Sequence, residues 1–225
     1  MLTIGLLLPE LLGTYGDSGN ARVLAHRVRA RSLPAEIVVM KVGESLPEAD
    51  VYVLGGGEDG PQRLACDLLR ASDLVRRVND GAHLFAVCAG LQIIGTSFAV
   101  AGSDNFEGLG LIDAVTQRGQ VRSVGDLALS VGDAVLVGFE NHGGVTTLGE
   151  GVRPLGAVCR GRGNDGESDG VRTQHIWATY AHGPALAMNP WLADEILSAA
   201  LGRELDPYVS VADRLHLARR QALGL

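Results

Sequence analysis

Short apolar runs alternate with stretches of helical periodicity across the first half of the chain. The runs "LTIGLLL", "AEIVVMKV", "ADVYVLGGG" and "HLFAVC" are bounded by turn residues, which is typical of buried strands. The stretches 18–31, 61–80 and 89–98 between them place apolar residues at helical spacing, and they predict helices. Strands that alternate with helices are typical of an α/β fold, in which a mostly parallel sheet carries helices on both faces.

The pattern changes from about Gly108, where glycines become frequent and the apolar runs shorten. "LALSV", "AVLVGF", "PLGAVCR" and "TQHIWATYA" predict short strands in an added antiparallel region, and "CRGRGNDGESDG" predicts a polar loop. The segments "PWLADEILSAALG" and "SVADRLHLARRQALG" predict two closing helices within about 190–225. Because nothing resembles a linker, we expect residues 1–225 to form a single domain.

Composition excludes several classes of protein. The chain has 225 residues, a formal net charge of −7 and a hydrophobic share of 46%. That charge argues against nonspecific binding of nucleic acid, which needs clustered cations. No apolar stretch is long enough to span a bilayer, and "MLTIGLLLPELLG" lacks the basic region of a signal peptide. We therefore expect a cytoplasmic protein without membrane insertion.

The three cysteines are widely spaced and form no CxxC pair. Neither a disulfide framework nor a zinc site is encoded by this spacing, and we expect no metal and no cofactor. Cys66 lies in the middle of a predicted helix and Cys159 in a predicted strand. We assign both to packing.

Cys88 differs, because it stands where a predicted strand turns sharply into a predicted helix. Its neighbours Ala86, Ala89 and Gly90 are small, as a strained strand-to-helix elbow requires. Unpaired N–H groups at the start of a helix favour a thiolate, so Cys88 is a candidate nucleophile. The alternative is a buried cysteine that only fills space.

A thiolate nucleophile needs a histidine nearby, and His182 is the best candidate. It follows the run "IWATYA" and so lies at the sheet edge that Cys88 also reaches. His142 lies with Glu140 and Asn141 in "FENHGG", a polar cluster that a turn held by side-chain hydrogen bonds explains about as well. The remaining histidines are weaker candidates. His26 and His216 lie on predicted helices, His175 lies within a predicted strand, and His83 begins a strand at the opposite edge of the sheet.

The segment "LGGGEDG" follows the third predicted strand. It lacks the lysine and the Ser/Thr of a P-loop, and triple glycine alone is most often a tight turn. Its functional interpretation is an oxyanion hole, in which the backbone N–H groups near Gly56 and of Ala89 approach the developing charge.

Together these residues resemble the class I glutamine amidotransferases, a family with a flavodoxin-like α/β fold. "AVCAGLQ" is similar to the family's G-x-C-x-G-x-Q, with Ala86 in place of the first glycine, and "LGGG" and "TYAHGP" resemble its oxyanion and histidine segments. Most members carry a glutamate two residues after the histidine, where this chain has Pro184. That departure is typical of the cobyric acid synthase-like (CobB/CobQ-type) branch. We therefore expect no acidic partner for His182 within this chain.

Within that branch, five segments resemble the glutaminase subunits of lipid II isoglutaminyl synthases (the GatD type). They are "TYGDSGN", "YVLGGGEDGPQ", "NFEGLGLID", "VGFENHGG" and "GRGND". The resemblance implies hydrolysis of L-glutamine to glutamate and ammonia through a thioester on Cys88, with His182 as acid and base. It also implies oxyanion donors at Gly56 and Ala89.

The same resemblance implies which residues bind the substrate glutamine. Arg122, in "QVRSVGD", would bind its carboxylate, for which a guanidinium fork is suited. Gln92, Asn141 and His142 are further candidates for the substrate pocket. Without the resemblance, a surface arginine in a turn and a glutamine in helix packing would be equally good interpretations of Arg122 and Gln92.

The chain contains no Walker motif for binding ATP. The resemblance therefore implies that a separate synthetase takes the ammonia, namely a Mur-ligase-like subunit (MurT type) that amidates the D-glutamate of lipid II. We expect this partner to supply the missing carboxylate to His182 or to order its loop. Three alternatives stay open: an amidotransferase subunit for another acceptor such as a cobyrinate, a catalytically silent docking subunit, and a cysteine hydrolase that needs no partner.

Overall fold

The first sheet of the protein is mostly parallel, as the alternation of strands and helices predicts. The computed structural model describes residues 1–100 and 105–225. In this sheet the strand order is β11-β12-β4-β3-β1-β2, and every neighbouring pair is parallel except β11 with β12. Its strands are β1 (Leu2–Leu7), β2 (Ala35–Met40), β3 (Val51–Leu54), β4 (His83–Val87), β11 (Val171–Arg172) and β12 (Ile176–Thr179).

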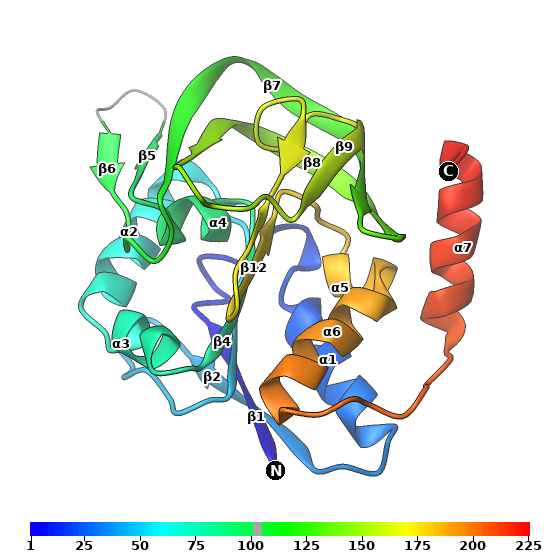
Figure 1. Cartoon of the computed structure of the whole chain (residues 1–225). Helices are drawn as coiled ribbons and strands as arrows, with labels where there is room; N and C mark the ends of the chain where they lie inside the picture. Colours follow the sequence, from blue (N-terminus) through cyan, green and yellow to red (C-terminus); the bar gives the residue numbers. More distant parts are fainter. Residues whose placement is uncertain (101–104) are drawn as a thin grey trace.

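Helices cover both faces of this sheet (Figure 1). One face carries α1 (Gly19–Arg29), α5 (Ala185–Met188) and α6 (Pro190–Leu201). The other carries α2 (Asp59–Arg70), α3 (Leu74–Asn79) and α4 (Ala89–Ile94). The predicted helix over 61–80 is therefore two helices, separated by a short turn.

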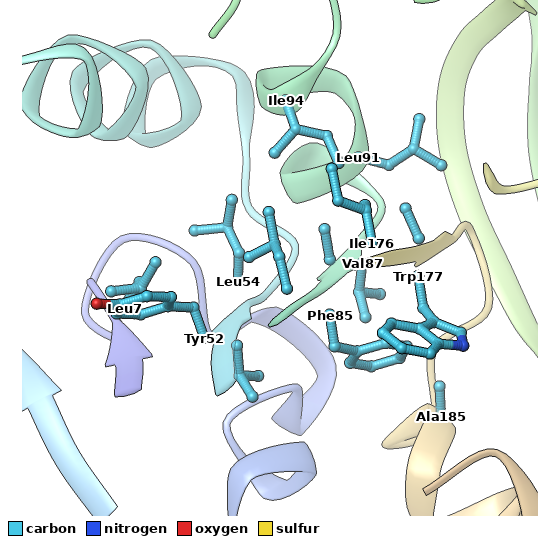
Figure 2. Packing of buried hydrophobic residues seen from close by; sticks show 14 of the residues in the cluster. Leu7, Tyr52, Leu54, Phe85, Val87, Leu91, Ile94, Ile176, Trp177 and Ala185 are labelled. Atoms are coloured by element: carbon cyan, nitrogen blue, oxygen red, sulfur yellow. The ribbon is translucent and has the colours of Figure 1, made fainter. Parts of the chain in front are cut away.

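The core lies between the sheet and these helices, because strands covered on both faces must be apolar on both. Figure 2 shows Tyr52, Phe85 and Trp177 packed among aliphatic side chains, and all three are fully buried. The residues of β3 are likewise buried along the whole strand. This continuous burial explains why the strand runs in the sequence read as unbroken apolar stretches.

The second half corrects the prediction of short strands. β7 (Ala114–Val131) and β8 (Ala134–Leu148) form one long antiparallel hairpin, in which β7 has 18 residues. The predicted helix over 89–98 ends at Ile94, because β5 (Ser97–Ala99) joins this second sheet beside β7. The predicted loop 159–170 also contains a strand, β10. The remaining strands of the sheet are β6 (Asn105–Glu107), β9 (Gly156–Arg160) and β10 (Ser168–Asp169).

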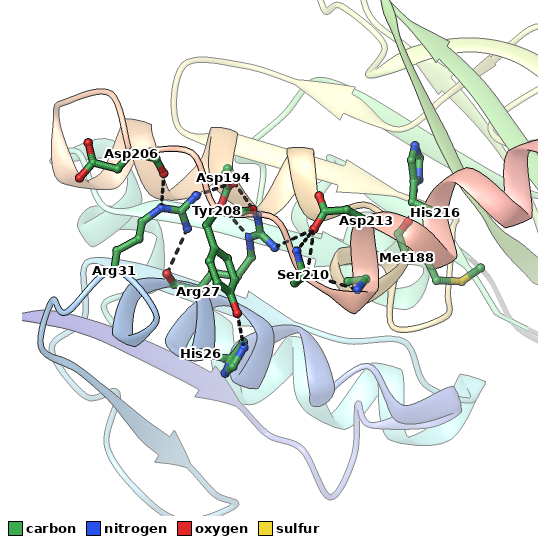
Figure 3. A network of polar contacts seen from close by, with 11 residues as sticks. His26, Arg27, Arg31, Met188, Asp194, Asp206, Tyr208, Ser210, Asp213 and His216 are labelled. Atoms are coloured by element: carbon green, nitrogen blue, oxygen red, sulfur yellow. Dashed lines mark hydrogen bonds and ion pairs between the residues drawn. The ribbon is translucent and has the colours of Figure 1, made fainter.

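The last helix, α7 (Val211–Leu223), is fastened to the body of the protein by a polar network (Figure 3). Arg27 of α1 donates two hydrogen bonds of 2.6 Å to Asp194 of α6, and its guanidinium also lies 3.9 Å from Asp213 of α7. His216 Nδ1 donates a hydrogen bond of 2.8 Å to Met188 O, and its side chain is buried. Within the described residues, no helix has the length and apolar character needed to cross a membrane.

Candidate active site

Cys88 lies at the strand-to-helix elbow that the sequence predicts. It follows β4 directly and precedes α4, with φ of 51° and ψ of −106°, a backbone conformation that residues other than glycine rarely adopt. Its N–H donates to Thr179 O of β12 at 2.9 Å. Gly90 makes the elbow possible, since an added Cβ would lie 2.8 Å from Leu54 O. The turn therefore holds the Cys88 side chain at the carboxyl edge of the sheet.

His182 follows β12, the strand next to β4, and its backbone is fixed from the second sheet. Its N–H donates to Phe139 O at 2.8 Å, and its carbonyl accepts from Phe139 N at 3.3 Å. The Phe139 ring also stacks on the imidazole, with ring centroids 5.5 Å apart. The side chain is buried, so both sheets together determine where the imidazole lies.

The acidic partner of His182 is Asp17, which comes from the opposite end of the chain. His182 Nδ1 lies 2.9 Å from Asp17 Oδ2, and both side chains are buried. Because a carboxylate only accepts hydrogen bonds, Nδ1 carries the proton and Nε2 is left open. Nε2 makes no hydrogen bond within the described part of the chain.

This contact corrects the expectation that His182 has no acidic partner in the chain. Pro184 does occupy the position two residues after the histidine, where most class I members carry glutamate. The loop after β1 supplies the carboxylate instead, 165 residues away in sequence. A partner subunit therefore has no vacant carboxylate position to fill.

The strand order explains why these residues meet. Reading across the sheet, β12, β4, β3 and β1 are neighbours. The segments that follow their carboxyl ends contain His182, Cys88, Gly56 and Asp17 in the same order. Parallel strands bring such segments to one edge, where ligands of α/β proteins bind.

Gly56 was expected to donate its N–H to the oxyanion, but the structure gives it another role. Its N–H donates to Asp17 Oδ2 at 2.9 Å, so in this structure it is not available to an oxyanion. An added Cβ would lie 2.7 Å from His182 Cε1 and 3.3 Å from Cys88 Cβ. Glycine here lets the three segments approach closely and helps to orient the carboxylate.

The electrostatic setting of His182 favours its charged form. Burial alone would lower the pKa of His182, but the hydrogen bond to Asp17 and the neighbouring Cys88 outweigh burial and raise it to about 9. An imidazolium that faces a cysteine is therefore the form present near neutral pH.

Arg122 and Asn141 reach the site through Tyr15. Arg122 Nε donates to Asn141 Oδ1 at 2.5 Å, and Asn141 Nδ2 donates to the Tyr15 hydroxyl. The Tyr15 ring meets the His182 imidazole edge to face, with centroids 4.9 Å apart. The structure thus brings both substrate-binding candidates to the mouth of the site.

Gln92 and His142 lie behind the site with their polar atoms occupied. Gln92 Nε2 donates to the Tyr180 hydroxyl at 3.0 Å, and its Oε1 accepts from Gln62 at 2.7 Å. His142 contacts Gly144 O through Nδ1 and the Glu140 carboxylate through Nε2, both at 3.0 Å, and is 3% exposed.

The assignment of His142 to substrate binding is therefore corrected. Residues alternate between the two faces of a strand, and β8 turns Glu140 and His142 inward while Asn141 lies between them. Glu140 also accepts from the N–H groups of Arg162 and Gly163, at 2.7 and 2.9 Å. Burial alone would raise the pKa of Glu140, but His142 and these N–H groups lower it. The pair fixes β8 and is closed to a ligand.

The other two cysteines differ from Cys88. Cys66 is buried within α2, and burial raises the pKa of its thiol, as suits a cysteine that packs. Cys159 is exposed on β9, so its assignment to packing was wrong.

Asp17 and Tyr15 are the site residues that the sequence interpretation missed. Both lie in "TYGDSGN", which was used only for its resemblance to a family. One signal was present: a polar segment with an aspartate follows the first strand, and such segments reach the edge that Cys88 and His182 reach. The short helical turn Thr14–Gly16 carries this loop.

Comparison with known proteins identifies the family. Residues 3–190 match the model of the CobB/CobQ-like glutamine amidotransferase domain. The chain belongs to this family. The match spans β1 to the start of α6, and so it includes the segments that carry Asp17, Gly56, Cys88 and His182.

Two relatives of this amidotransferase domain match over most of their length. One is the lipid II isoglutaminyl synthase (glutamine-hydrolyzing) subunit GatD of Staphylococcus aureus, which is 32% identical over 92% of this chain and 87% of its own. The protein of the same name from Streptococcus pneumoniae is 30% identical over 90% of this chain and 82% of its own. Among solved structures, one titled as a glutamine amidotransferase aligns with a TM-score of 0.57 at 23% identity, over 88% of this chain and 98% of that one, and it supports the fold.

Proposed function

We propose that this chain is the glutaminase subunit of a lipid II isoglutaminyl synthase and hydrolyses L-glutamine at Cys88. The observation that carries the proposal is the open Nε2 of His182. The imidazole is oriented by Asp17 at 2.9 Å, is buried, and belongs to the site that also holds Cys88. The two GatD relatives, similar over most of their length, support the choice of enzyme.

The first half of the reaction forms a thioester. The Cys88 thiolate attacks the side-chain carbonyl carbon of glutamine, and the carbonyl oxygen becomes an oxyanion. The imidazolium of His182 gives its Nε2 proton to the amide nitrogen, the C–N bond breaks, and ammonia leaves. His182 is then neutral, and Asp17 keeps its Nδ1 proton in place.

Backbone N–H groups stabilise the oxyanion. Ala89 opens α4, where N–H groups have no partner within the helix, and it directly follows the nucleophile. Since the N–H of Gly56 is held by Asp17, Ala89 is the oxyanion donor that we assign.

The second half releases glutamate. His182 Nε2 takes a proton from water, and the hydroxide attacks the thioester carbonyl. When the intermediate collapses, glutamate leaves and the Cys88 thiolate returns beside an imidazolium. Arg122 binds the carboxylate of glutamine at the mouth of the site, where Asn141 steadies the guanidinium.

The ammonia passes to a synthetase subunit of the Mur-ligase type, which amidates the D-glutamate of lipid II. The alternative within the same family is a complex that transfers the ammonia to a cobyrinate. Ammonia transfer measured with the purified synthetase, ATP and either acceptor decides between them.

Replacement of the nucleophile tests the proposal. Cys88→Ala should abolish release of ammonia from glutamine and leave folding intact, whereas Cys66→Ala and Cys159→Ala should keep activity. Full glutaminase activity of Cys88→Ala in the complex would overturn the proposal.

A further inference from the structure

A buried carboxylate of the second sheet contacts the segment 179–182, which ends at His182. Asp169 is the last residue of β10 and is fully buried. It accepts a hydrogen bond of 2.5 Å from the Thr179 hydroxyl, and the N–H of Tyr180 donates to its two oxygens at 3.2 and 3.3 Å. Asp169 therefore holds the chain at the point where β12 ends and the segment 179–182 begins.

Thr179 connects this carboxylate to both reacting groups. Its hydroxyl donates to Asp169 and accepts a hydrogen bond of 3.0 Å from the N–H of Ala181, the residue before His182. Its carbonyl accepts from the N–H of Cys88 at 2.9 Å. A shift of Thr179 would therefore move Cys88 and His182 relative to each other.

The loop that leads to Asp169 keeps the carboxylate in this place. Asn164 is buried, and its side chain accepts from the N–H of Gly170 at 3.0 Å and donates to the carbonyl of Gly170 at 2.9 Å. Gly163 has φ of 60°, and an added Cβ would lie 2.6 Å from Asp169 Cβ. The glycine lets the loop pass close to Asp169, and the asparagine fastens the backbone on its other side.

A charged group at this position costs free energy that packing does not require. Burial raises the pKa of Asp169 to about 6, although the hydrogen bonds from Thr179 and Tyr180 oppose that rise, so the carboxylate is charged near neutral pH. Both donors are neutral, and burying a charge without a cation is expensive. A carboxylate only accepts hydrogen bonds, so it orients both donors in a way that an amide does not. Departures of this kind from an apolar core are expected where a protein functions.

We propose that Asp169 is a positioning residue for glutamine hydrolysis, which holds Thr179 so that His182 and Cys88 stay aligned on the substrate amide. This inference rests on the proposed function and adds to it a residue that touches neither the substrate nor the reacting atoms. A small displacement of a catalytic group slows the chemical step strongly. The effect of losing Asp169 therefore falls on kcat.

The test is a double-mutant cycle on the purified chain, alone and with its synthetase subunit. Asp169→Asn and Thr179→Val each remove one side of the contact and nearly keep the shape of the side chain, so each should lower kcat for glutamine by about 10- to 100-fold. KM should stay within about threefold, because Arg122 is held by Asn141 and not by Thr179. The double variant should lose no more than about threefold beyond the slower single variant. Thr179→Ser keeps the hydroxyl and should retain kcat within about threefold.

The control variant is Asp165→Ala, on the same loop. Asp165 is exposed, and its side chain accepts from the N–H groups of Glu167 and Ser168 at 2.9 and 2.8 Å. The variant loosens the loop without removing a contact to Thr179, so kcat should stay within about threefold. A loss of kcat equal to that of Asp169→Asn would show that only the integrity of the loop matters, and it would overturn the inference.

Two further results would overturn the inference and leave the proposed function intact. One is a folded Asp169→Asn protein with kcat within about threefold of the unmodified protein, and the other is a double variant whose losses multiply. If Asp169→Asn does not fold, the comparison of Thr179→Val with Thr179→Ser decides, and equal kcat values would contradict the inference. If the unmodified protein hydrolysed no glutamine, the proposed function and this inference would both be overturned.

Discussion

In the part of the chain that the structure describes, two buried histidines each contact a carboxylate, and the pairs differ at one ring nitrogen. His182 bonds Asp17 through Nδ1, and its Nε2 has no hydrogen bond within the described residues. His142 bonds Gly144 O through Nδ1 and Glu140 through Nε2, so both ring nitrogens are occupied. Burial and a carboxylate are common to both pairs. The open nitrogen, in a site that holds a cysteine, is what separates a candidate catalytic histidine from a structural one.

The carboxylates differ in the same way. Glu140 accepts two backbone N–H groups from the loop after β9 in addition to His142, and it ties that loop to β8. Asp17 accepts His182 and the Gly56 N–H on the same oxygen, while its Oδ1 has no partner in the described part of the chain. We expect loss of Glu140 to affect folding, and loss of Asp17 to affect chemistry.

The largest expected effect comes from His182. His182→Ala removes the group that protonates the leaving ammonia and later activates water, so kcat for glutamine should fall by about 10⁴-fold or more. Release of ammonia under saturating glutamine measures this. A loss below tenfold would show that another group performs the proton transfer.

The second pair gives the next effect, on stability. Glu140→Gln removes the charge of a buried carboxylate that accepts from His142 and from two backbone N–H groups, so the free energy of unfolding should fall by about 3–5 kcal/mol. Denaturant unfolding measures the loss. When the folded fractions are matched, kcat of Glu140→Gln should stay within about fivefold of that of the unmodified protein. A hundredfold loss of kcat would show that the Glu140–His142 pair is also needed for catalysis.

The pH dependence of stability sharpens the comparison further. The folded-state pKa of His182 is about 9, above the ordinary value of 6.5, so its stabilising contribution is complete below 6.5 and is lost as pH rises through 9. Between about pH 6 and pH 10 this group should contribute a loss of about 1–3 kcal/mol. Asp17→Asn should remove most of it in paired unfolding curves. If Asp17→Asn lost as much unfolding free energy between the two pH values as the unmodified protein does, Asp17 would not be the group that raises the pKa of His182.

The smallest effect concerns the residue that covers the imidazole. Tyr15→Phe keeps the ring against His182 and removes the hydroxyl that accepts from Asn141. Since Asn141 also steadies Arg122, KM for glutamine should rise by about 2- to 10-fold with little change in kcat. Steady-state kinetics separate the two parameters, and a fall in kcat alone would assign Tyr15 to the chemistry instead.

The sequence predicted the first sheet and the common edge of Cys88 and His182, because both depend on local patterns. An apolar run that stops at a small-residue elbow is visible within "HLFAVCAGLQ", and "IWATYA" ends just before His182. The carboxyl ends of neighbouring parallel strands then must meet, and β4 and β12 are neighbours.

Local sequence patterns did not predict the roles of Asp17 and His142. The contact between Asp17 and His182 joins segments 165 residues apart, and no periodicity in either segment indicates the pairing. His142 was interpreted as part of a loop, which hid the alternation that turns it inward beside Glu140 along β8. Once the strand is known, the inward position of both residues follows from its period.

The most direct test of the account is kcat for glutamine hydrolysis by Asp17→Asn, measured on the chain alone and with its synthetase subunit. Asparagine keeps the shape of the side chain but no longer stabilises the imidazolium, so we predict a fall in kcat of about 10²–10⁴-fold under both conditions. Activity close to that of the unmodified protein would contradict the account, because the acidic partner of His182 would then lie outside this chain.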